Sequence, residues 1–274
     1  MVFEEILINQ FLQSFSTPTL NLFFKLITYF GHPIVWMLLA AWYFWVGKEK
    51  KSFMVASTIL FVGFIAGGLK ELIARPRPEG LLPISTDEGF SFPSGHATLS
   101  SAFFGFYEKK LKRKIKWIMF ALVILTAISR IYLGVHYLTD VLAGLVLGYI
   151  IGKAMLILEK RVEKARFHIS AMKEEGLIVL LFIAIIAGLY FLPEYLYMVQ
   201  ALLGYYLGFA IFAHTKIKLK PKHPKIALSF GTVIFGGIGG AAYITHDALA
   251  MLLFFIGGLF ISIIWPLIIH KAKI

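Results

Sequence analysis

The sequence predicts an all-α protein, a polytopic bundle of transmembrane helices preceded by an N-terminal interfacial helix. Of its 274 residues, 59% are hydrophobic and 15% are charged, and a soluble domain carries fewer apolar and more charged residues. Several apolar stretches approach or exceed the roughly 20 residues that a helix needs to cross a bilayer. The chain has no cysteine, so disulfides and thiolate metal sites are excluded.

The N-terminal segment, residues 1–32, is predicted to lie at the membrane surface. Its first residues, Met-Val-Phe-Glu-Glu, are acidic and lack the basic segment of a cleaved signal peptide, so we expect the segment to remain in the mature protein. Residues 3–15 mix apolar and polar side chains, which favours an interfacial amphipathic helix. Residues 17–30 carry Asn21 and Lys25 and are predicted to be half-inserted, which leaves open whether they cross the membrane.

The rest of the chain divides into about nine predicted spans, separated by polar or proline-containing loops. These spans cover residues 33–46, 53–74, 94–107, 115–133, 138–158, 177–192, 195–212, 226–244 and 248–269. A charged segment follows the fifth span, and we expect residues 159–175 to form a cytoplasmic linker. Residues 176–274 then form a four-helix transmembrane extension.

Basic residues recur in every second loop. Lysine and arginine concentrate in cytoplasmic loops, so the segments placed inside the cell are 48–51, 109–116, 160–166, 216–225 and 270–273. The segments placed outside are 75–93, 134–137, 193–194 and 245–247. The same rule accounts for the net charge of +12, so no nucleic-acid partner is predicted. We expect a multi-pass protein of the cell (plasma) membrane.

Three cations gather at the predicted outer end of the second span, in the sequence Lys70-Glu-Leu-Ile-Ala-Arg75-Pro-Arg77-Pro78. Lys70 alone would be interpreted as a lysine whose ammonium reaches the interface. Arg75 and Arg77 could likewise anchor lipid headgroups. The tendency of cations to stay on the cytoplasmic side argues against placing three of them outside without a specific role.

A second cluster, Phe92-Pro93-Ser94-Gly95-His96, directly precedes the third predicted span. A helix start has unpaired N–H groups that bind anions, and Gly95 lets a ligand approach the backbone. A proline-serine cap is common and is weak evidence by itself. The adjacent His96 makes the cluster a stronger candidate site.

A third cluster runs from Ser129 and Arg130 to His136 and Asp140. His136 and Asp140 are four residues apart, so they lie on one face of a helix. The carboxylate can fix the imidazole tautomer, which leaves the other ring nitrogen as a nucleophile or base. An ordinary histidine–aspartate helix cap is the alternative. Arginine and aspartate in or near hydrocarbon are costly, which favours a function.

Together the three clusters suit a phosphate group. Lys70, Arg77 and Arg130 can neutralise its oxygens, and two histidines can divide the roles of nucleophile and acid. The clusters contain no group of carboxylates suited to magnesium. A mechanism without a metal ion is therefore predicted.

The three motifs resemble those of the type-2 phosphatidic acid phosphatase superfamily, which includes lipid phosphatases and vanadium haloperoxidases. The family pattern is lysine, six residues, arginine-proline; then proline-serine-glycine-histidine; then serine-arginine, five residues, histidine, three residues, aspartate. This chain matches all three in order, and spacing and predicted sidedness agree. The resemblance covers roughly residues 33–158, which it identifies as a phosphatase core.

The resemblance implies a role for each matched residue. His136 attacks phosphorus and forms a phosphohistidine, Asp140 orients His136, and His96 protonates the leaving oxygen. The implied mechanism needs no metal and no organic cofactor. The groups expected to hold the phosphate oxygens are Lys70, Arg77, Ser94, the Gly95 amide and Arg130. The implied substrate is the phosphate of a membrane lipid on the outer or periplasmic face. Undecaprenyl diphosphate is the leading hypothesis among polyprenyl diphosphates, phosphatidic acid, phosphatidylglycerol phosphate and lipid A phosphates.

Other functions remain open at this point. Vanadate-dependent oxidation uses the same fold, but those enzymes are typically soluble. A phosphotransferase would share the first half of the reaction and pass the phosphate to another lipid. A lipid transporter or scramblase would use the basic pocket for headgroups, with Gly236, Gly237, Gly239 and Gly240 allowing helices to slide, although a nucleophile and an acid are superfluous for transport. The sequence also leaves a homo-oligomer open.

Overall fold

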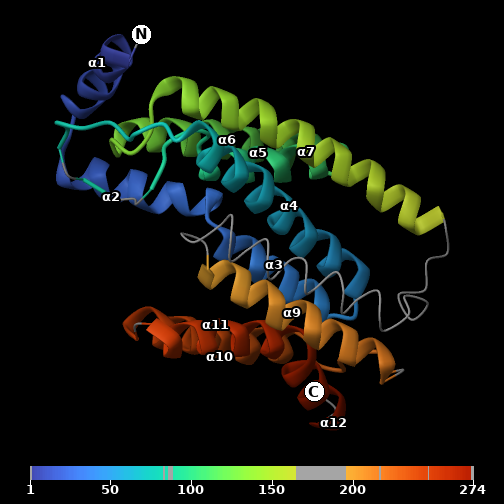
Figure 1. Ribbon diagram of the computed structural model, residues 1–274. Coiled ribbons are helices and arrows are strands. Elements are labelled where there is room, and N and C mark those ends of the chain that lie inside the picture. Colours follow the sequence, from blue (N-terminus) through green and yellow to red (C-terminus); the bar gives the residue numbers. More distant parts are fainter. Residues whose placement is uncertain are drawn as a thin grey trace. The chain divides into compact units, whose positions relative to one another are not determined.

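The computed structural model describes residues 2–82, 84–85, 89–164, 196–215, 217–245 and 247–272, and the regular structure in these ranges is helical (Figure 1). This confirms the all-α class. In chain order the helices are α1 Val2–Gln13, α2 Pro18–Ile27, η1 Thr28–Gly31, α3 Pro33–Trp45, α4 Glu49–Ile73, α5 Gly95–Tyr107, α6 Arg113–Tyr132, α7 Leu138–Lys164, α9 Leu196–His214, α10 Pro224–Ile244, α11 Asp247–Leu259, η4 Phe260–Ile264 and α12 Trp265–Ala272.

Six helical segments in the described part of the chain are long and apolar enough to cross a membrane. They are Glu49–Ile73, Arg113–Tyr132, Leu138–Arg161, Leu196–His214, Pro224–Ile244 and Ala248–Ala272. The segments Pro18–Gly31 and Pro33–Trp45 meet at a bend of 50°, and counting this pair as one broken span would give seven.

The predicted count of nine spans is therefore not confirmed. Helices α3 and α5 match two of the predicted spans, but each has 13 residues. A helix of that length rises about 20 Å, against a hydrocarbon core of about 30 Å. The predicted span at 177–192 lies outside the described residues.

The helices group into two compact units, which are described separately. The first comprises Met1–Val35 and Phe61–Arg161, and the second Trp36–Leu60 and Val162–Ile274. All the candidate site residues belong to the first unit. The division inferred from sequence, at residues 32, 158 and 175, remains a prediction.

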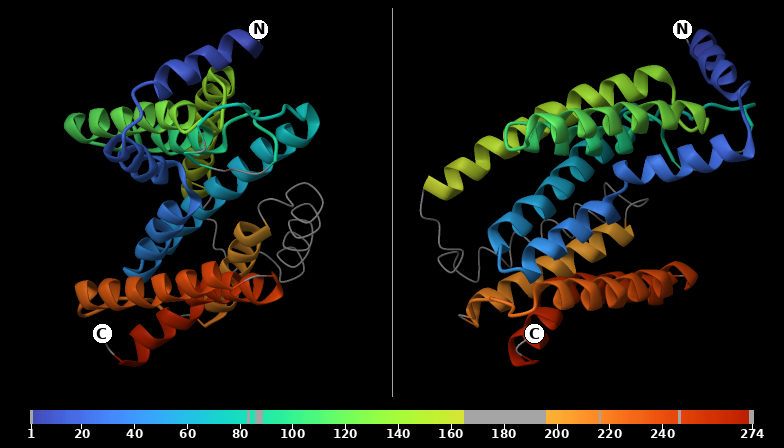
Figure 2. Two further views of the ribbon diagram at one scale, coloured as in Figure 1. Left: turned by 90° about the vertical axis from the view of Figure 1, so that its left-hand side faces the viewer. Right: turned by 180° about the vertical axis from the view of Figure 1, so that it is seen from behind.

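Within the first unit, glycines on one face of α7 allow α5 to pack directly against it (Figure 2). A Cβ atom added at Gly144, Gly148 or Gly152 would lie closer than 3.0 Å to a backbone carbonyl of the α5 segment. Small residues at this four-residue spacing are typical of close helix packing in membranes. The contact brings the first turns of α5 and α7, which carry two of the three motifs, next to each other.

The N-terminal helix α1 holds the turn between α6 and α7 through two buried amides. The Nδ2 of Asn9 donates hydrogen bonds to the carbonyls of Ile131 (2.8 Å) and His136 (3.0 Å). One helical turn later, the Nε2 of Gln13 donates to the carbonyl of Tyr132 (3.0 Å). These bonds tie α1 to the backbone at the end of α6 and in the turn that follows it, so α1 also holds the backbone of His136 in place.

In the second unit, polar side chains pair between helices. The hydroxyls of Ser52 and Tyr205 lie 2.7 Å apart, and the Nε1 of Trp45 donates to the carbonyl of Ile261 (3.0 Å). Buried polar groups are stable in apolar surroundings only when they are hydrogen-bonded. Residues of α3 and α4 are thereby tied to the C-terminal helices.

Candidate active site

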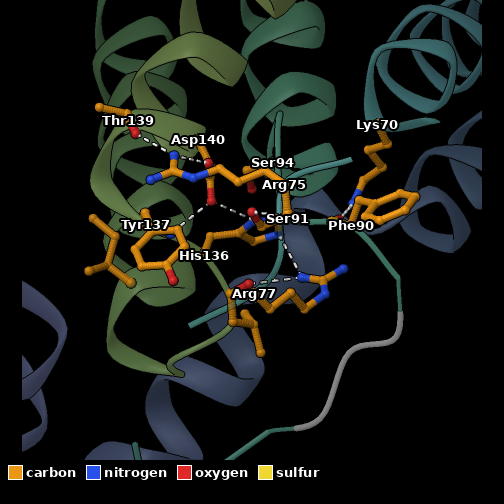
Figure 3. Close-up of polar contacts among 12 residues, drawn as sticks. Lys70, Arg75, Arg77, Phe90, Ser91, Ser94, His136, Tyr137, Thr139 and Asp140 are labelled. Atoms are coloured by element: carbon orange, nitrogen blue, oxygen red, sulfur yellow. Dashed lines mark hydrogen bonds and ion pairs between the residues drawn. The ribbon is translucent and has the colours of Figure 1, made fainter. Parts of the chain in front are cut away.

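The first motif spans the end of α4, with Lys70 in the last turn of the helix and Arg77 in the loop that follows. The helix stops because Ala74 adopts a left-handed conformation (φ 49°), and the Ala74 amide donates to the carbonyl of Lys70 in a common helix-ending arrangement. The Lys70 side chain is 2% exposed, and its ammonium donates to the carbonyl of Phe90 (Figure 3). Lys70 therefore lies against the loop that carries the second motif.

Arg77, from the same motif, lies against the third motif. Its Nη1 donates to the carbonyl of Val135 (2.8 Å) and lies 3.4 Å from the Nε2 of His136. Its Nε donates to the carbonyl of Gly89 (2.9 Å). The backbone contacts hold the guanidinium in place beside one specific nitrogen of His136.

The second motif places Ser94 at the N-cap of α5, with Gly95 as the first residue of the helix. The Ser94 amide donates to the backbone carbonyl of Asp140 (3.0 Å). The Ser94 hydroxyl is buried and, among the described residues, has no hydrogen-bond partner. A buried polar group of this kind, beside the N–H groups of a helix start, is suited to bind an anion.

His136 and Asp140 lie close together, as their spacing predicts. The Nδ1 of His136 is 3.6 Å from the Oδ2 of Asp140, which is longer than a hydrogen bond. Asp140 instead accepts hydrogen bonds from the Tyr137 amide (2.8 Å, on Oδ2) and from Arg75 (2.6 Å, on Oδ1). In this structure the predicted carboxylate–imidazole pair is thus adjacent but not directly bonded.

His96 and Arg130 lie toward η1. The Nη1 of Arg130 donates to the Oγ1 of Thr28 (2.9 Å), and the ring of His96 lies 5.8 Å from that of His32. Arg130, His32, His136 and Arg77 all lie near enough to His96 to influence its charge. The structure thus brings both histidines and the predicted cations into one region.

Three further residues of this region are not among the predicted site residues, namely Arg75, Thr139 and Glu5. Arg75 donates to Thr139 (2.6 Å) and to Glu5 (3.1 Å) as well as to Asp140. Arg75 could be recognised from the sequence as a candidate, because it lies two residues before Arg77 in the first motif. Glu5 could not be recognised in this way, because it meets partners 70 and 134 residues away.

The electrostatic environment of Glu5 favours its charged form. Burial by itself raises the pKa of the carboxyl, but hydrogen bonds from the amide and hydroxyl of Thr139 and from Arg75 outweigh burial and leave the pKa lowered. The described residues contain no group of three or more histidine, cysteine, aspartate or glutamate side chains that could hold a metal ion.

The fold and the site define a class: a helical membrane protein in which cationic side chains, two histidines and a helix start come together in one region. Comparison with known proteins gives the family. The sequence profile of the PAP2 superfamily matches residues 51–164, and this range contains all three motifs. The chain belongs to the PAP2 superfamily.

Several characterised relatives are similar over part of the chain. Phosphatidylglycerophosphatase B of Bacillus subtilis is 37% identical over 93 residues, which cover 30% of this chain and 45% of the relative. Decaprenylphosphoryl-5-phosphoribose phosphatase of Mycobacterium tuberculosis is 33% identical over 138 residues, covering 46% and 73%. Undecaprenyl-diphosphatase BcrC of Bacillus subtilis is 35% identical over 123 residues, covering 42% and 62%.

The likeness extends to a solved structure. The crystal structure of a transmembrane PAP2 type phosphatidylglycerolphosphate phosphatase from Bacillus subtilis is similar with a TM-score of 0.50 and 26% identity, over 62% of this chain and 87% of that one. The chain spans less than half the length of the first curated relatives that it matches.

Proposed function

We propose that the protein is an integral membrane phosphatase that removes a terminal phosphate from a membrane lipid through a phosphohistidine on His136. The observation that carries this proposal is the environment of the His136 ring. Its Nε2 lies 3.4 Å from the Nη1 of Arg77, and its Nδ1 faces Asp140 at 3.6 Å. One nitrogen therefore faces a cation that can bind a phosphate oxygen, and the other faces a carboxylate.

This environment suits nucleophilic attack by Nε2. A proton on Nδ1, favoured by the negative charge of Asp140, leaves the lone pair on Nε2. Attack forms a bond between Nε2 and phosphorus as the bond from phosphorus to the bridging oxygen breaks. Protonated His96 gives its proton to that oxygen. Water then attacks the phosphohistidine while His96 takes up a proton, which restores both histidines.

The remaining matched residues bind the phosphate oxygens in this proposal. Lys70, Arg77 and Arg130 supply positive charge, and the Gly95 amide and the Ser94 hydroxyl supply hydrogen bonds. The unsatisfied Ser94 hydroxyl supports this assignment. Fixed donors aimed at developing charge are usually the largest contribution to catalysis of this kind.

We propose a lipid phosphate on the outer or periplasmic face of the cell membrane as the substrate. The relatives are named for lipids that differ in their headgroups, namely a phosphatidylglycerophosphate, a decaprenyl-linked phosphoribose and undecaprenyl diphosphate. A terminal phosphate on a lipid is what these names share. Undecaprenyl diphosphate is our first choice for testing.

The test is a phosphate-release assay with pure protein in detergent against undecaprenyl diphosphate, phosphatidylglycerol phosphate, phosphatidic acid and lipid A. We expect release from at least one lipid, persistence in EDTA and inhibition by vanadate. His136→Ala should abolish both turnover and covalent labelling by substrate carrying ³²P in its terminal phosphate. His96→Ala should retain part of its activity on a phosphate ester with a good leaving group, because such a group departs without a proton.

Two outcomes would contradict the proposal. One is wild-type protein that releases no phosphate from any of these lipids. The other is turnover that survives in His136→Ala. Transfer of the labelled phosphate to an added lipid instead of water would assign the protein to the phosphotransferases, which use the same first step.

A further inference from the structure

Arg75 differs from the other cations of the site because two carboxylates already share its charge. Its guanidinium lies 3.1 Å from Glu5 and 2.6 Å from Asp140, and it also donates to Thr139. The Tyr137 ring lies 4.2 Å from the same guanidinium, a favourable cation–π geometry. This balance of charge makes Arg75 poorly suited to bind a phosphate, and places it behind Asp140 as seen from His136 (Figure 3).

Glu5 completes this arrangement from the N-terminal helix. Its Oε2 accepts hydrogen bonds from the amide (3.0 Å) and the hydroxyl (2.7 Å) of Thr139, in the first turn of α7. Carboxylates are stabilised at helix starts because N–H groups there have no helical partner. Asp140 accepts the Tyr137 amide in the same turn. Two carboxylates thus meet at the start of α7, with Arg75 bound to both.

We infer that Glu5 is a positioning residue that acts on the nucleophile His136 through Arg75 and Asp140. This inference rests on the proposed function. Asp140 divides its negative charge between Arg75 on one oxygen and the His136 side on the other. Glu5 draws part of the positive charge of Arg75 away from Asp140, which leaves more of the Asp140 charge to support the His136 imidazole.

Charged and titratable groups from several segments lie in the region around His136. Arg77 and Asp140 face its two ring nitrogens, and the others are Lys70 of α4, Arg75 of the following loop, His96 of α5, Arg130 of α6 and Glu5 of α1. Changes at Glu5 and Arg75 leave the other members of this set in place. The effects of these two changes on the pKa of His136 can therefore be compared while the other charged groups stay the same.

The two changes should shift the pH dependence of activity in opposite directions. Glu5→Gln removes a negative charge, and Arg75 then no longer shares its positive charge between Glu5 and Asp140. Asp140 is neutralised more completely, so the pKa of the His136 imidazole should fall. The acid limb of kcat/KM then moves to lower pH, by about half a unit. Arg75→Gln removes the positive charge beside Asp140, so the acid limb should move to higher pH, by about one unit.

Matched variants separate this role from a general loss of structure. Glu4→Gln changes the same charge on the neighbouring, exposed residue of α1 and should leave the pH profile at its wild-type position. Arg75→Lys keeps the charge but loses the planar group that reaches three acceptors, so it should lower kcat with little movement of the limb. In the Arg75→Gln background, Glu5→Gln should shift the acid limb by less than it does in wild type, because Arg75 no longer links Glu5 to Asp140.

The titration of His136 can also be followed without turnover, by NMR of protein labelled on histidine and assigned with His136→Asn. Opposite shifts for Glu5→Gln and Arg75→Gln support the inference. The inference is overturned, even if the enzyme is active, when the pKa of His136 is unchanged in both variants or shifts in the same direction in both. An inactive wild type with opposite His136 shifts would refute the proposed function and leave the positioning role supported.

Discussion

At the scale of single residues, we expect the Ser94 hydroxyl to contribute to phosphate binding and not to the stability of the fold. It is buried, and no described residue is hydrogen-bonded to it, so the folded protein gains nothing from it. Ser94→Ala should leave thermal stability unchanged or slightly higher. A hydrogen bond to a charged group contributes about 1.5–3 kcal/mol, so the inhibition constant of vanadate should rise about tenfold or more.

Ser101 is a suitable control for this experiment. Its hydroxyl lies two turns further along α5 and donates to the carbonyl of Leu145 (2.6 Å). Ser101→Ala loses that bond between helices, so it should lower stability by about 1 kcal/mol and leave vanadate inhibition unchanged. Equal effects of the two variants on vanadate inhibition would contradict the assignment of Ser94 to phosphate binding.

The candidate residues that sequence could predict are those in motifs with fixed local spacing. Lys70, Arg77, Ser94 and His136 are of this kind, and the structure brings them together. Their catalytic roles remain predictions. Glu5 could not be found in this way, because its carboxylate acquires a role only when α1 packs against the start of α7. The sequence also predicted a direct pair between His136 and Asp140, and could not reveal that Arg75 takes one carboxylate oxygen.

At the scale of helices, the contact between α5 and α7 depends on glycine. A Cβ at Gly148 would lie closer than 3.0 Å to the carbonyl of Thr98, and backbone atoms cannot move aside easily. Gly148→Ala should therefore destabilise the protein by about 1–3 kcal/mol, the usual cost of overpacking. Activity should fall as well, because the shift of α5 also moves Ser94 relative to His136.

Gly236 provides the matched control in α10. A Cβ there meets nothing within 4 Å, and alanine favours a helix by up to about 1 kcal/mol over glycine. Gly236→Ala should be neutral or stabilising in thermal unfolding, with unchanged turnover. If both alanine variants unfold at the same temperature, the α5–α7 contact is less tight than these distances indicate.

The helices themselves were largely predictable, because apolar stretches bounded by proline, glycine and charge mark a membrane helix. Predicted spans at 115–133, 138–158 and 226–244 agree closely with α6, α7 and α10. The bounds of α3 and α5 agree to within one residue with the predicted spans at 33–46 and 94–107. Apolar composition did not reveal whether these two helices cross the bilayer, because each has 13 residues and is shorter than the hydrocarbon core.

At the scale of the whole molecule, the predicted sidedness rests on the charges at the two ends of the first unit. At the C-terminal ends of α5 and α7, basic residues pair with acidic ones: Lys153 and Lys116 with Glu108, and Lys110 with Glu159. Burial alone raises the pKa of Glu108, but its bonds to Lys153 and Tyr149 outweigh burial and leave the pKa lowered. The candidate site lies at the other ends of these helices.

Thiol labelling tests this orientation. A cysteine at Ser85, in the loop between the first two motifs, should react with an impermeant reagent added outside intact cells. A cysteine at Lys114, which is exposed at the start of α6, should react only after the cells are opened. The chain has no cysteine of its own, so the background is clean. The reverse pattern would place the candidate site in the cytoplasm.

The contact between Glu5 and Thr139 also has a consequence for how the protein is made. The two residues are 134 positions apart, and ribosomes add about 5–20 residues per second. The first helix is therefore synthesised about 7–27 seconds before its partner exists. During that interval Asn9, Gln13 and Glu5 lack the backbone groups that they bind in the finished protein, and water or lipid headgroups must solvate them. The candidate site is therefore complete only after α7 has been synthesised and α1, the oldest part of the chain, has docked onto it.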